Sequence, residues 1–474
     1  MDLLLTEHKT LKIFTENSAL EATALIFDEV DFAAVKDGEV RQIKHRVYPF
    51  LIQHSEKEAC LELKSDYYIG LDWLVKDRHY VHIQPKVNLQ LLELFKESLE
   101  DEQTEEDETD TERVEKITAS AQAQVDYLRM LLEVYSGSIT AEEIGDLVQI
   151  FWDDPLITIE QKDDQLTPFL IVQFLSLLKS IVKKGLRKSY YKVQENLSNR
   201  VKGKILVGPQ IKQNLLKNRF TKTYCEFQVF GEDYAENRFL KKVLRFSESY
   251  VQNNGTFFQN TKADVQEMIN YCRPAFERIG DQLSERELHY IKYNPFFKEY
   301  QETIKIGKYI LKQFDFNISS ATGTVAKIPP FWIDMPRLFE LYVYKQLLND
   351  NHHDRERIRF QFATHGNYLD FLIKDGERSM IIDAKYKLHY QHSHIHQDIR
   401  QVAGYARLKM VREKIGLAPD DDRNIACLII YPTLNEQESS FKLDEIIDRF
   451  SQESNQIKAY HKVYKLGIPL PLVE

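Results

Sequence analysis

The alternation of apolar and polar residues changes several times along the chain and predicts segments of different secondary structure. Residues 1–97 contain short apolar runs between turn residues, as in Ala59–Leu63, which is typical of strands. Apolar residues recur with a helical period across residues 117–195 and 236–315, whereas residues 196–230 resemble strands again. We therefore expect a β-rich N-terminal domain followed by a mainly helical middle region.

The C-terminal part combines both patterns and predicts an α/β core within an α+β multidomain protein. The apolar run Ile425–Tyr431 is of the kind that is buried at the centre of a sheet. We expect a mixed sheet flanked by helices Pro336–Leu348 and Asp398–Val411. The expected domains are 1–97 (N-terminal, β-rich), 98–116 (acidic linker), 117–320 (mainly helical, with a basic strand segment) and 321–474 (mixed-sheet domain).

Two apolar segments in this last domain, 368–374 and 379–386, are separated by a strong hairpin signal. Asp375-Gly376 is a dipeptide typical of two-residue turns between antiparallel strands. Such a turn places Asp370 opposite Ile381 and Tyr368 opposite Asp383.

This register brings charged side chains to one face of the hairpin. Because side chains alternate along a strand, Asp383 and Lys385 share a face, and Asp370 lies on it diagonally to Asp383. Two carboxylates and the carbonyl of Ala384 are oxygen ligands suited to Mg²⁺, with Mn²⁺ as an alternative. Lys385 would stabilise charge on a phosphate, so the group suits metal-dependent cleavage of a phosphodiester. The alternative is a set of solvated charges on an edge strand.

Two further segments offer candidate site residues. Gln397–Leu408 reads as a helix on which Gln401 and Tyr405 lie along one face, either beside Lys385 or on an ordinary amphipathic surface. Glu340 lies within a strongly apolar helical run and needs a partner if it is buried. It is either a further metal ligand or half of an ion pair in the core.

The order of these residues resembles the PD-(D/E)xK nuclease superfamily, in the branch that adds a Gln-x-x-x-Tyr helix. Leu369 stands where the usual proline precedes the first aspartate, and this proline is not a ligand. Other blocks resemble the McrC family in its own order: Tyr68–Asp72, His82–Lys86, Gly185–Tyr191, Gly203–Ile205, Cys225–Lys241 and Leu338–Val343.

The resemblance to McrC implies a specific function and partner. Proteins of this family are the nuclease subunits of McrBC-type restriction systems that act on DNA containing 5-methylcytosine. The resemblance therefore implies double-stranded, modified DNA as substrate and an McrB-like AAA+ GTPase hexamer as partner. It also implies that the N-terminal region contacts the GTPase ring.

Charge is distributed unevenly along the chain. The net charge of −10 comes largely from residues 100–112, which hold nine acids and no base. Residues 183–222 instead collect lysines and arginines with Tyr190 and Tyr191 among them, which suits either DNA phosphates or an acidic partner protein.

The remaining features limit the classes of protein to consider. Four widely spaced cysteines give neither a zinc ribbon nor a disulfide framework, and we expect a cytoplasmic protein without a signal peptide or membrane helix. His389, His392, His394 and His396 suit a metal site on an extended loop, or are a solvated loop.

No nucleotide-binding P-loop motif occurs, so any motor must lie on another polypeptide. Four arginines are equal candidates for stimulating a partner's GTPase: Arg187, Arg200, Arg219 and Arg238. Two alternatives to a partnered nuclease stay open, a non-catalytic regulator of the GTPase ring and an autonomous nuclease without a motor.

Overall fold

In the computed structural model the chain forms two compact units. The first contains residues 1–158 and 327–474, and the second contains residues 159–326. It describes residues 2–7, 10–15, 25–36, 50–55, 60–88, 122–135, 139, 141–145, 147–160, 164, 166–258, 261–281, 283, 297–319, 325–364, 367–386, 392–418, 421–433, 441–449, 456–457 and 460–473. The predicted acidic linker lies outside the described residues. The chain leaves the first unit and returns to it through the paired strands β11 (Ile157–Glu160) and β15 (Val325–Ile328).

The N-terminal part of the first unit contains two larger sheets and one two-stranded sheet. One larger sheet has the order β3-β2-β5-β4 and the other β1-β7-β6-β16-β10, so the second sheet takes in β16 from far along the chain. Trp332 of β16 is buried in the core that these sheets enclose with Leu3 and Val81. The elements are β1 (Asp2–Thr6), β2 (Thr10–Thr15), β3 (Leu25–Phe27), α1 (Glu29–Lys36), β4 (Phe50–Ser55), β5 (Cys60–Ser65), β6 (Tyr68–Val75), β7 (His79–Gln84), β8 (Lys86–Asn88), β9 (Gln122–Gln124), α4 (Tyr127–Tyr135), α5 (Ala141–Ile144), β10 (Val148–Ile150) and β16 (Phe331–Asp334).

The C-terminal part of this unit is a five-stranded mixed sheet with the order β17-β18-β19-β20-β21. The first three strands are antiparallel to one another, and β19, β20 and β21 are parallel. Helices α12 and α13 both pack against β19, as the expected architecture required. The elements are α12 (Met335–Asp350), β17 (Ile358–Thr364), β18 (Asn367–Ile373), β19 (Met380–Ala384), α13 (His392–Tyr405), α14 (Lys409–Lys414), β20 (Ala426–Thr433), α15 (Leu443–Arg449) and β21 (Val463–Pro469).

The turn between β18 and β19 differs from the predicted two-residue turn. A 3₁₀-helix, η7 (Gly376–Arg378), lengthens the connection, and Phe371 pairs with Ile382. The hydroxyl of Ser379 explains the longer turn, because it accepts a hydrogen bond from Asp375 N at 2.9 Å and donates one to Gly376 O at 2.8 Å. The predicted register was therefore wrong by two residues.

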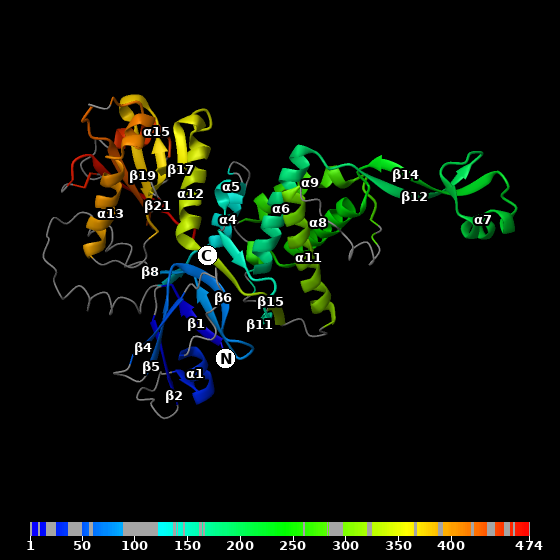
Figure 1. Cartoon of the computed structure of the whole chain (residues 1–474), viewed down its shortest axis with the longest axis horizontal. Coiled ribbons are helices and arrows are strands. Elements are labelled where there is room, and N and C mark those ends of the chain that lie inside the picture. Colours follow the sequence, from blue (N-terminus) through cyan, green and yellow to red (C-terminus); the bar gives the residue numbers. More distant parts are fainter. Residues whose placement is uncertain are drawn as a thin grey trace. The chain divides into compact units, whose positions relative to one another are not determined.

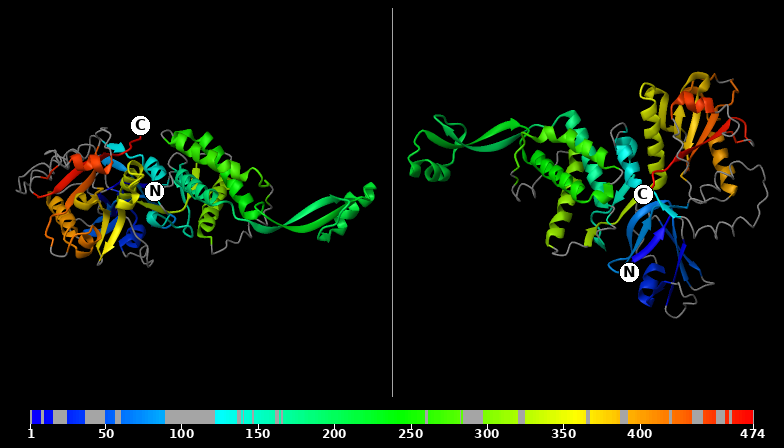
Figure 2. Two further views of the ribbon diagram at one scale, coloured as in Figure 1. Left: turned by 90° about the horizontal axis from the view of Figure 1, so that it is seen from above. Right: turned by 180° about the vertical axis from the view of Figure 1, so that it is seen from behind.

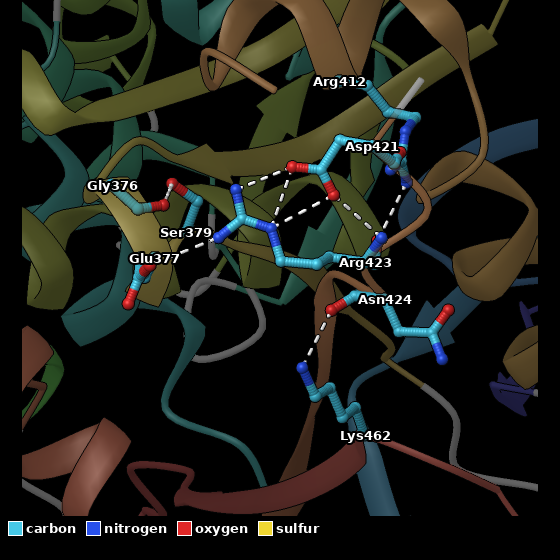
Figure 3. Close-up of polar contacts among 8 residues, drawn as sticks. All are labelled: Gly376, Glu377, Ser379, Arg412, Asp421, Arg423, Asn424 and Lys462. Atoms are coloured by element: carbon cyan, nitrogen blue, oxygen red, sulfur yellow. Dashed lines mark hydrogen bonds and ion pairs between the residues drawn. The ribbon is translucent and has the colours of Figure 1, made fainter. Parts of the chain in front are cut away.

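Ion pairs fix this turn against the segment that leads into β20. Arg423 forms hydrogen bonds of 2.7–3.1 Å with the carboxylate of Asp421 and reaches Glu377 at 3.3 Å (Figure 3). Arg412 donates to the carbonyls of Asp421 and Arg423. This network holds the end of the hairpin that carries η7.

The second unit consists of a helical part and an arm, residues 189–231. In the helical part, α11 packs against α6 and α8, and α9 packs against α6. The elements are α6 (Leu166–Lys184), β12 (Ser189–Ser198), β13 (Lys204–Ile205), α7 (Val207–Gln213), η3 (Leu215–Lys217), β14 (Lys222–Gly231), α8 (Ala235–Asn253), η4 (Gly255–Phe258), α9 (Lys262–Cys272), η5 (Arg273–Phe276) and α11 (Lys298–Ser319).

Helix α6 corrects the expectation that no segment is apolar enough to span a membrane. Helix α6 is long and apolar enough to cross a membrane, and no other helix among the described residues is. However, 61% of its apolar window is buried inside the protein, as in a core helix. Phe169, Leu170 and Phe174 are fully buried.

The arm extends away from the helices of its unit, with α7 at its far end (Figures 1 and 2). Its strands β12 and β14 are antiparallel and pair over their whole length, from Ser189 with Gly231 to Ser198 with Lys222. Most side chains of both strands are partly or fully exposed. The arm therefore has little apolar core of its own.

Two glycines lie where neighbouring strands approach too closely for a side chain. A Cβ on Gly70 would lie 2.1 Å from the carbonyl oxygen of Phe331, and one on Gly203 would lie 2.3 Å from that of Glu226. Both also have positive φ values, which glycine adopts without strain. Gly70 thus permits β6 to pair with β16, and Gly203 permits the turn into β13.

Candidate active site

Asp370 and Asp383 lie on neighbouring strands of the C-terminal sheet. The paired register ends at Phe371 with Ile382, and Asp370 and Asp383 are the next residues along the two strands. Asp370 Oδ2 also accepts a hydrogen bond of 2.8 Å from Ala384 N. A shift of two residues keeps every side chain on its predicted face, so the two carboxylates come together although the predicted turn was wrong.

The environment of Asp370 disfavours its negative charge. Burial raises the pKa of Asp370 well above its usual range, and the charges of Asp383 and Glu340 add to this effect. Asp383 itself is only 2% exposed. Two carboxylates in such a position form a site at which a cation is favoured.

Lys385 supplies a positive charge beside this pair. Its Nζ lies 3.0 Å from Asp383 Oδ2. Burial by itself lowers the pKa of Lys385, but the charges of Asp383 and Asp370 outweigh burial, and the pKa is raised. The side chain is therefore an ammonium at neutral pH.

Helix α13 brings Gln401 and Tyr405 to this lysine. Lys385 Nζ donates to Gln401 Oε1 at 3.3 Å, and Gln401 Nε2 donates to the hydroxyl of Tyr405 at 2.7 Å. The apolar side of α13 packs on the sheet through Ile399 and Val402. The predicted one-face arrangement thus forms a chain of hydrogen bonds ending at Lys385.

Glu340 takes a different position from the other candidates. It forms an ion pair with Arg337 one turn earlier on α12, with 2.9 Å between Arg337 Nη1 and Glu340 Oε2. Burial raises the pKa of Glu340 more than Arg337 lowers it, and the charge of Asp383 also raises it. Glu340 is therefore the acid of an ion pair that borders the site. The sequence interpretation did not single out Arg337, although its spacing of three residues from Glu340 indicates such a pair.

The donor set suits a hard cation that keeps much of its water. Among the described residues, no group of three or more His, Cys, Asp or Glu side chains is arranged to hold a metal. Mg²⁺ is usually held by one or two carboxylates, with water and substrate phosphates completing the shell. Asp370 and Asp383, with the Ala384 carbonyl, fit that requirement.

Sequence comparison places these residues in a known family. Residues 64–414 match the family model described as McrBC 5-methylcytosine restriction system component. The chain belongs to this McrBC family. The matched region contains Asp370, Asp383, Lys385, Gln401 and Tyr405.

Two solved structures are similar to this McrBC family member. One is a refined half-complex from the tetradecameric assembly of Thermococcus gammatolerans McrB AAA+ hexamers with bound McrC, with 14% identity, a TM-score of 0.35, and coverage of 99% of this chain and 94% of that chain. The other is the cryo-EM structure of the Thermococcus gammatolerans McrBC complex, with 14% identity, a TM-score of 0.28, and coverage of 74% and 88%. No curated protein matches the chain.

The predicted histidine cluster does not form an extended loop. His392, His394 and His396 belong to helix α13. His389 lies outside the described residues.

The structure separates the four candidate arginines of this McrBC family member into two groups. Arg187 pairs with Glu236 at 3.3 Å and lies over the Phe297 ring, and Arg238 holds Asp233 through two hydrogen bonds of 2.7 and 2.9 Å. Both arginines are therefore held by acidic side chains of the same unit. Arg200 and Arg219 lie on the arm and are exposed.

Sequence reasoning missed the apolar character of the arm. Large apolar side chains are exposed along it, namely Tyr190, Val201, Ile205, Val207, Ile211, Leu215, Leu216, Phe220 and Phe230. The sequence does indicate this apolar character, because large apolar residues lie among the lysines of this segment. The basic residues alone had suggested either DNA phosphates or an acidic partner protein as the ligand.

Proposed function

We propose that the chain is the DNA endonuclease subunit of an McrBC-type, modification-dependent restriction system. The observation that carries this proposal is the convergence of Asp370, Asp383 and Lys385 at one end of β19. The order α12, β17, β18, β19, α13, β20 supports a PD-(D/E)xK nuclease core. The substrate is double-stranded DNA with a modified base, and the reaction is hydrolysis of a phosphodiester.

The proposed mechanism assigns a role to each residue of the site. Asp370, Asp383 and the Ala384 carbonyl would hold Mg²⁺, or Mn²⁺ in its place. Such an ion would polarise the phosphate and lower the pKa of a water. Lys385 stabilises the negative charge that develops on the phosphate oxygens.

Gln401 and Tyr405 act through Lys385. Gln401 accepts a hydrogen bond from the ammonium and is itself oriented by Tyr405. This restricts the position of a long, flexible side chain, which is needed for precise charge stabilisation. Glu340 is held by Arg337 and adds negative potential near Asp383.

The second part of the proposal is docking on a separate McrB-like AAA+ GTPase hexamer. The resemblance implied a contact through the N-terminal region, and we assign the docking to the arm instead, because Leu216 is 74% and Phe220 73% exposed. Exposed apolar groups of this size mark interaction sites on folded proteins. One base of the arm is paired with an acid, since Lys192 lies 3.4 Å from Glu226. These features favour a protein over DNA as the ligand of the arm.

Arg200 and Arg219 are the proposed residues for stimulating the partner's GTPase. They lie on the same arm and are exposed, whereas Arg187 and Arg238 are held in ion pairs. An arginine that reaches a neighbouring nucleotide site must be free of such partners.

Three variants test the two parts of this proposal together. Asp383→Ala is expected to abolish cleavage of methylated DNA and keep GTPase stimulation. The double variant Leu216→Asp with Phe220→Asp is expected to lose partner binding and both activities. Tyr271→Asp, at an exposed tyrosine on α9, is the matched control and should behave like wild type.

The outcomes separate the competing functions. A wild-type chain that stimulates the GTPase but never cuts, with any metal or partner, would establish a non-catalytic regulator. Cleavage of DNA by the purified chain alone would establish an autonomous nuclease. Full activity of Asp383→Ala would refute the assigned site.

A further inference from the structure

Tyr386 follows the proposed catalytic lysine directly and is buried against three elements. Its ring lies 5.8 Å from that of Phe339 on α12 and 6.2 Å from that of Tyr67, which precedes β6. Its hydroxyl lies 3.3 Å from Glu7 Oε2, to which it donates a hydrogen bond. Only 3% of Tyr386 is exposed.

Glu7 is an unusual partner because it is an acid buried at the end of β1. It is 6% exposed, and its Oε1 has no hydrogen-bond partner among the described residues. Burial raises the pKa of Glu7 well above its usual range, more than the hydrogen bond from Tyr386 lowers it. A buried polar group of this kind is costly and calls for a specific reason.

The backbone around Glu7 and Tyr67 is fixed, so both residues can act as anchors. Ser65 Oγ donates to the carbonyl of Thr6 at 2.7 Å, which ties the end of β1 to the end of β5. Met335 N donates to the carbonyl of Tyr67 at 3.1 Å, which ties the same region to the start of α12. The N-terminal sheets therefore present a rigid surface to Tyr386.

Lys385 needs such an anchor because it lies beyond the end of β19. Strand β19 ends at Ala384, and Lys385 N makes one further backbone hydrogen bond, of 2.8 Å, to Ile430 O. Successive side chains of an extended segment point to opposite sides. Fixing Tyr386 on one side thus sets the direction of Lys385 on the other.

We propose that Glu7 and Tyr386 are positioning residues through which the N-terminal sheets orient Lys385 toward Asp383. The inference rests on the proposed nuclease function. It makes the N-terminal segment part of the catalytic apparatus, although it lies more than 370 positions away in the sequence.

The test uses four substitutions in the full chain assembled with its GTPase partner. Tyr386→Phe and Glu7→Leu each remove the contact, whereas Glu7→Gln keeps a carbonyl acceptor. Tyr344→Phe is the matched control, because its hydroxyl also donates to an acid, Glu143, at 2.9 Å. Melting temperatures establish that each variant is folded.

Two readouts separate positioning from general stability. Tyr386→Phe and Glu7→Leu are expected to lower kcat about tenfold, the size of one lost hydrogen bond, with unchanged KM for DNA. Without metal or DNA, labelling of Lys385 by an amine-reactive reagent, followed by mass spectrometry, should become several times faster in both. Glu7→Gln and Tyr344→Phe should match wild type in both readouts.

Each outcome decides the proposal. Wild-type kcat and labelling in folded Tyr386→Phe or Glu7→Leu would overturn it, as would equal losses in Tyr344→Phe. If one of the two contact variants does not fold, the other carries the comparison with Glu7→Gln. If the wild-type complex does not cut DNA, the proposed function fails, and the labelling rates still establish whether the contact orients Lys385.

Discussion

Replacing Asp370 by asparagine should make the metal-free protein more stable while it abolishes cleavage. Asparagine has the same shape and keeps a carbonyl oxygen for the hydrogen bond from Ala384 N. It removes only the negative charge that lies opposite Asp383. The substitution therefore tests the effect of the charge of Asp370 separately from the effect of its packing.

The sign of the effect follows from the direction of the pKa shift. Burial and the charges of Asp383 and Glu340 raise the pKa of Asp370 in the folded state. Its favourable contribution is thus fully present below the unfolded-state pKa of about 3.9 and is lost as the pH rises through the folded-state pKa. At pH 7.5, far above the unfolded-state pKa, the aspartate therefore opposes folding, and asparagine does not.

The magnitude can be worked out from the strand geometry. Opposite residues of an antiparallel pair have Cβ atoms about 5 Å apart. Two carboxylates about 6 Å apart repel by roughly 3 kcal/mol at an effective dielectric constant of about 20. Lys385, 3.0 Å from Asp383, offsets part of this repulsion. We expect Asp370→Asn to gain about 1–2 kcal/mol at pH 7.5.

The assay is urea unfolding in the presence of a chelator, read by hydrogen exchange in peptides from β18 and β19. Glu356→Gln is the matched control, because this glutamate lies just before β17 of the same sheet and is exposed. The gain should shrink as the pH falls toward 4, and calorimetry should show weakened Mg²⁺ binding by the variant. Unchanged or lower stability of Asp370→Asn at pH 7.5 would refute the reasoning.

Three further predictions concern neighbouring residues. Lys385→Ala should cut at least about 100-fold more slowly while it still binds the partner, and the exposed Lys374→Ala should cut like wild type. Tyr405→Phe should lower the cleavage rate about threefold to tenfold, because it removes the 2.7 Å hydrogen bond from Gln401. Hydrogen bonds from Arg423 lower the pKa of Asp421 to about 2, so this pairing stabilises the fold above the unfolded-state pKa of about 3.9. The stability lost in Arg423→Ala should therefore diminish as the pH falls from about 4 to about 2, which acid titration of the thermal midpoint would measure.

The convergence of these side chains was predictable from the sequence because it depends on alternation rather than on exact register. The Asp-Gly dipeptide suggested a two-residue turn, and the contacts of Ser379 selected a longer one. An error of two residues leaves Asp370, Asp383 and Lys385 on one face, whereas an error of one would have separated them. The spacing of four residues likewise places Gln401 and Tyr405 on one face of a helix, wherever the helix begins.

Other features depended on contacts between distant parts of the chain. The pairing of β16 with β6 joins residues that are far apart in the sequence, and no local pattern indicates it. The partner of Glu340 was left open between a metal and an ion pair, because burial alone does not choose between them. Nothing in the sequence around Glu7 indicates its contact with Tyr386, because the two residues are far apart along the chain.

The energetics of the site favour a catalytic over a purely regulatory role. Asp370 and Asp383 are held together in a largely buried position, and this raises the pKa of Asp370 well above its usual range. Apolar residues of similar size would stabilise such a sheet by roughly 1–4 kcal/mol relative to buried charges. A subunit that only stimulated a GTPase through its arm would gain nothing from the acids, the lysine or the hydrogen-bonded Gln401. The proposed binding of a cation and stabilisation of phosphate charge would use all of them, which supports a catalytic role.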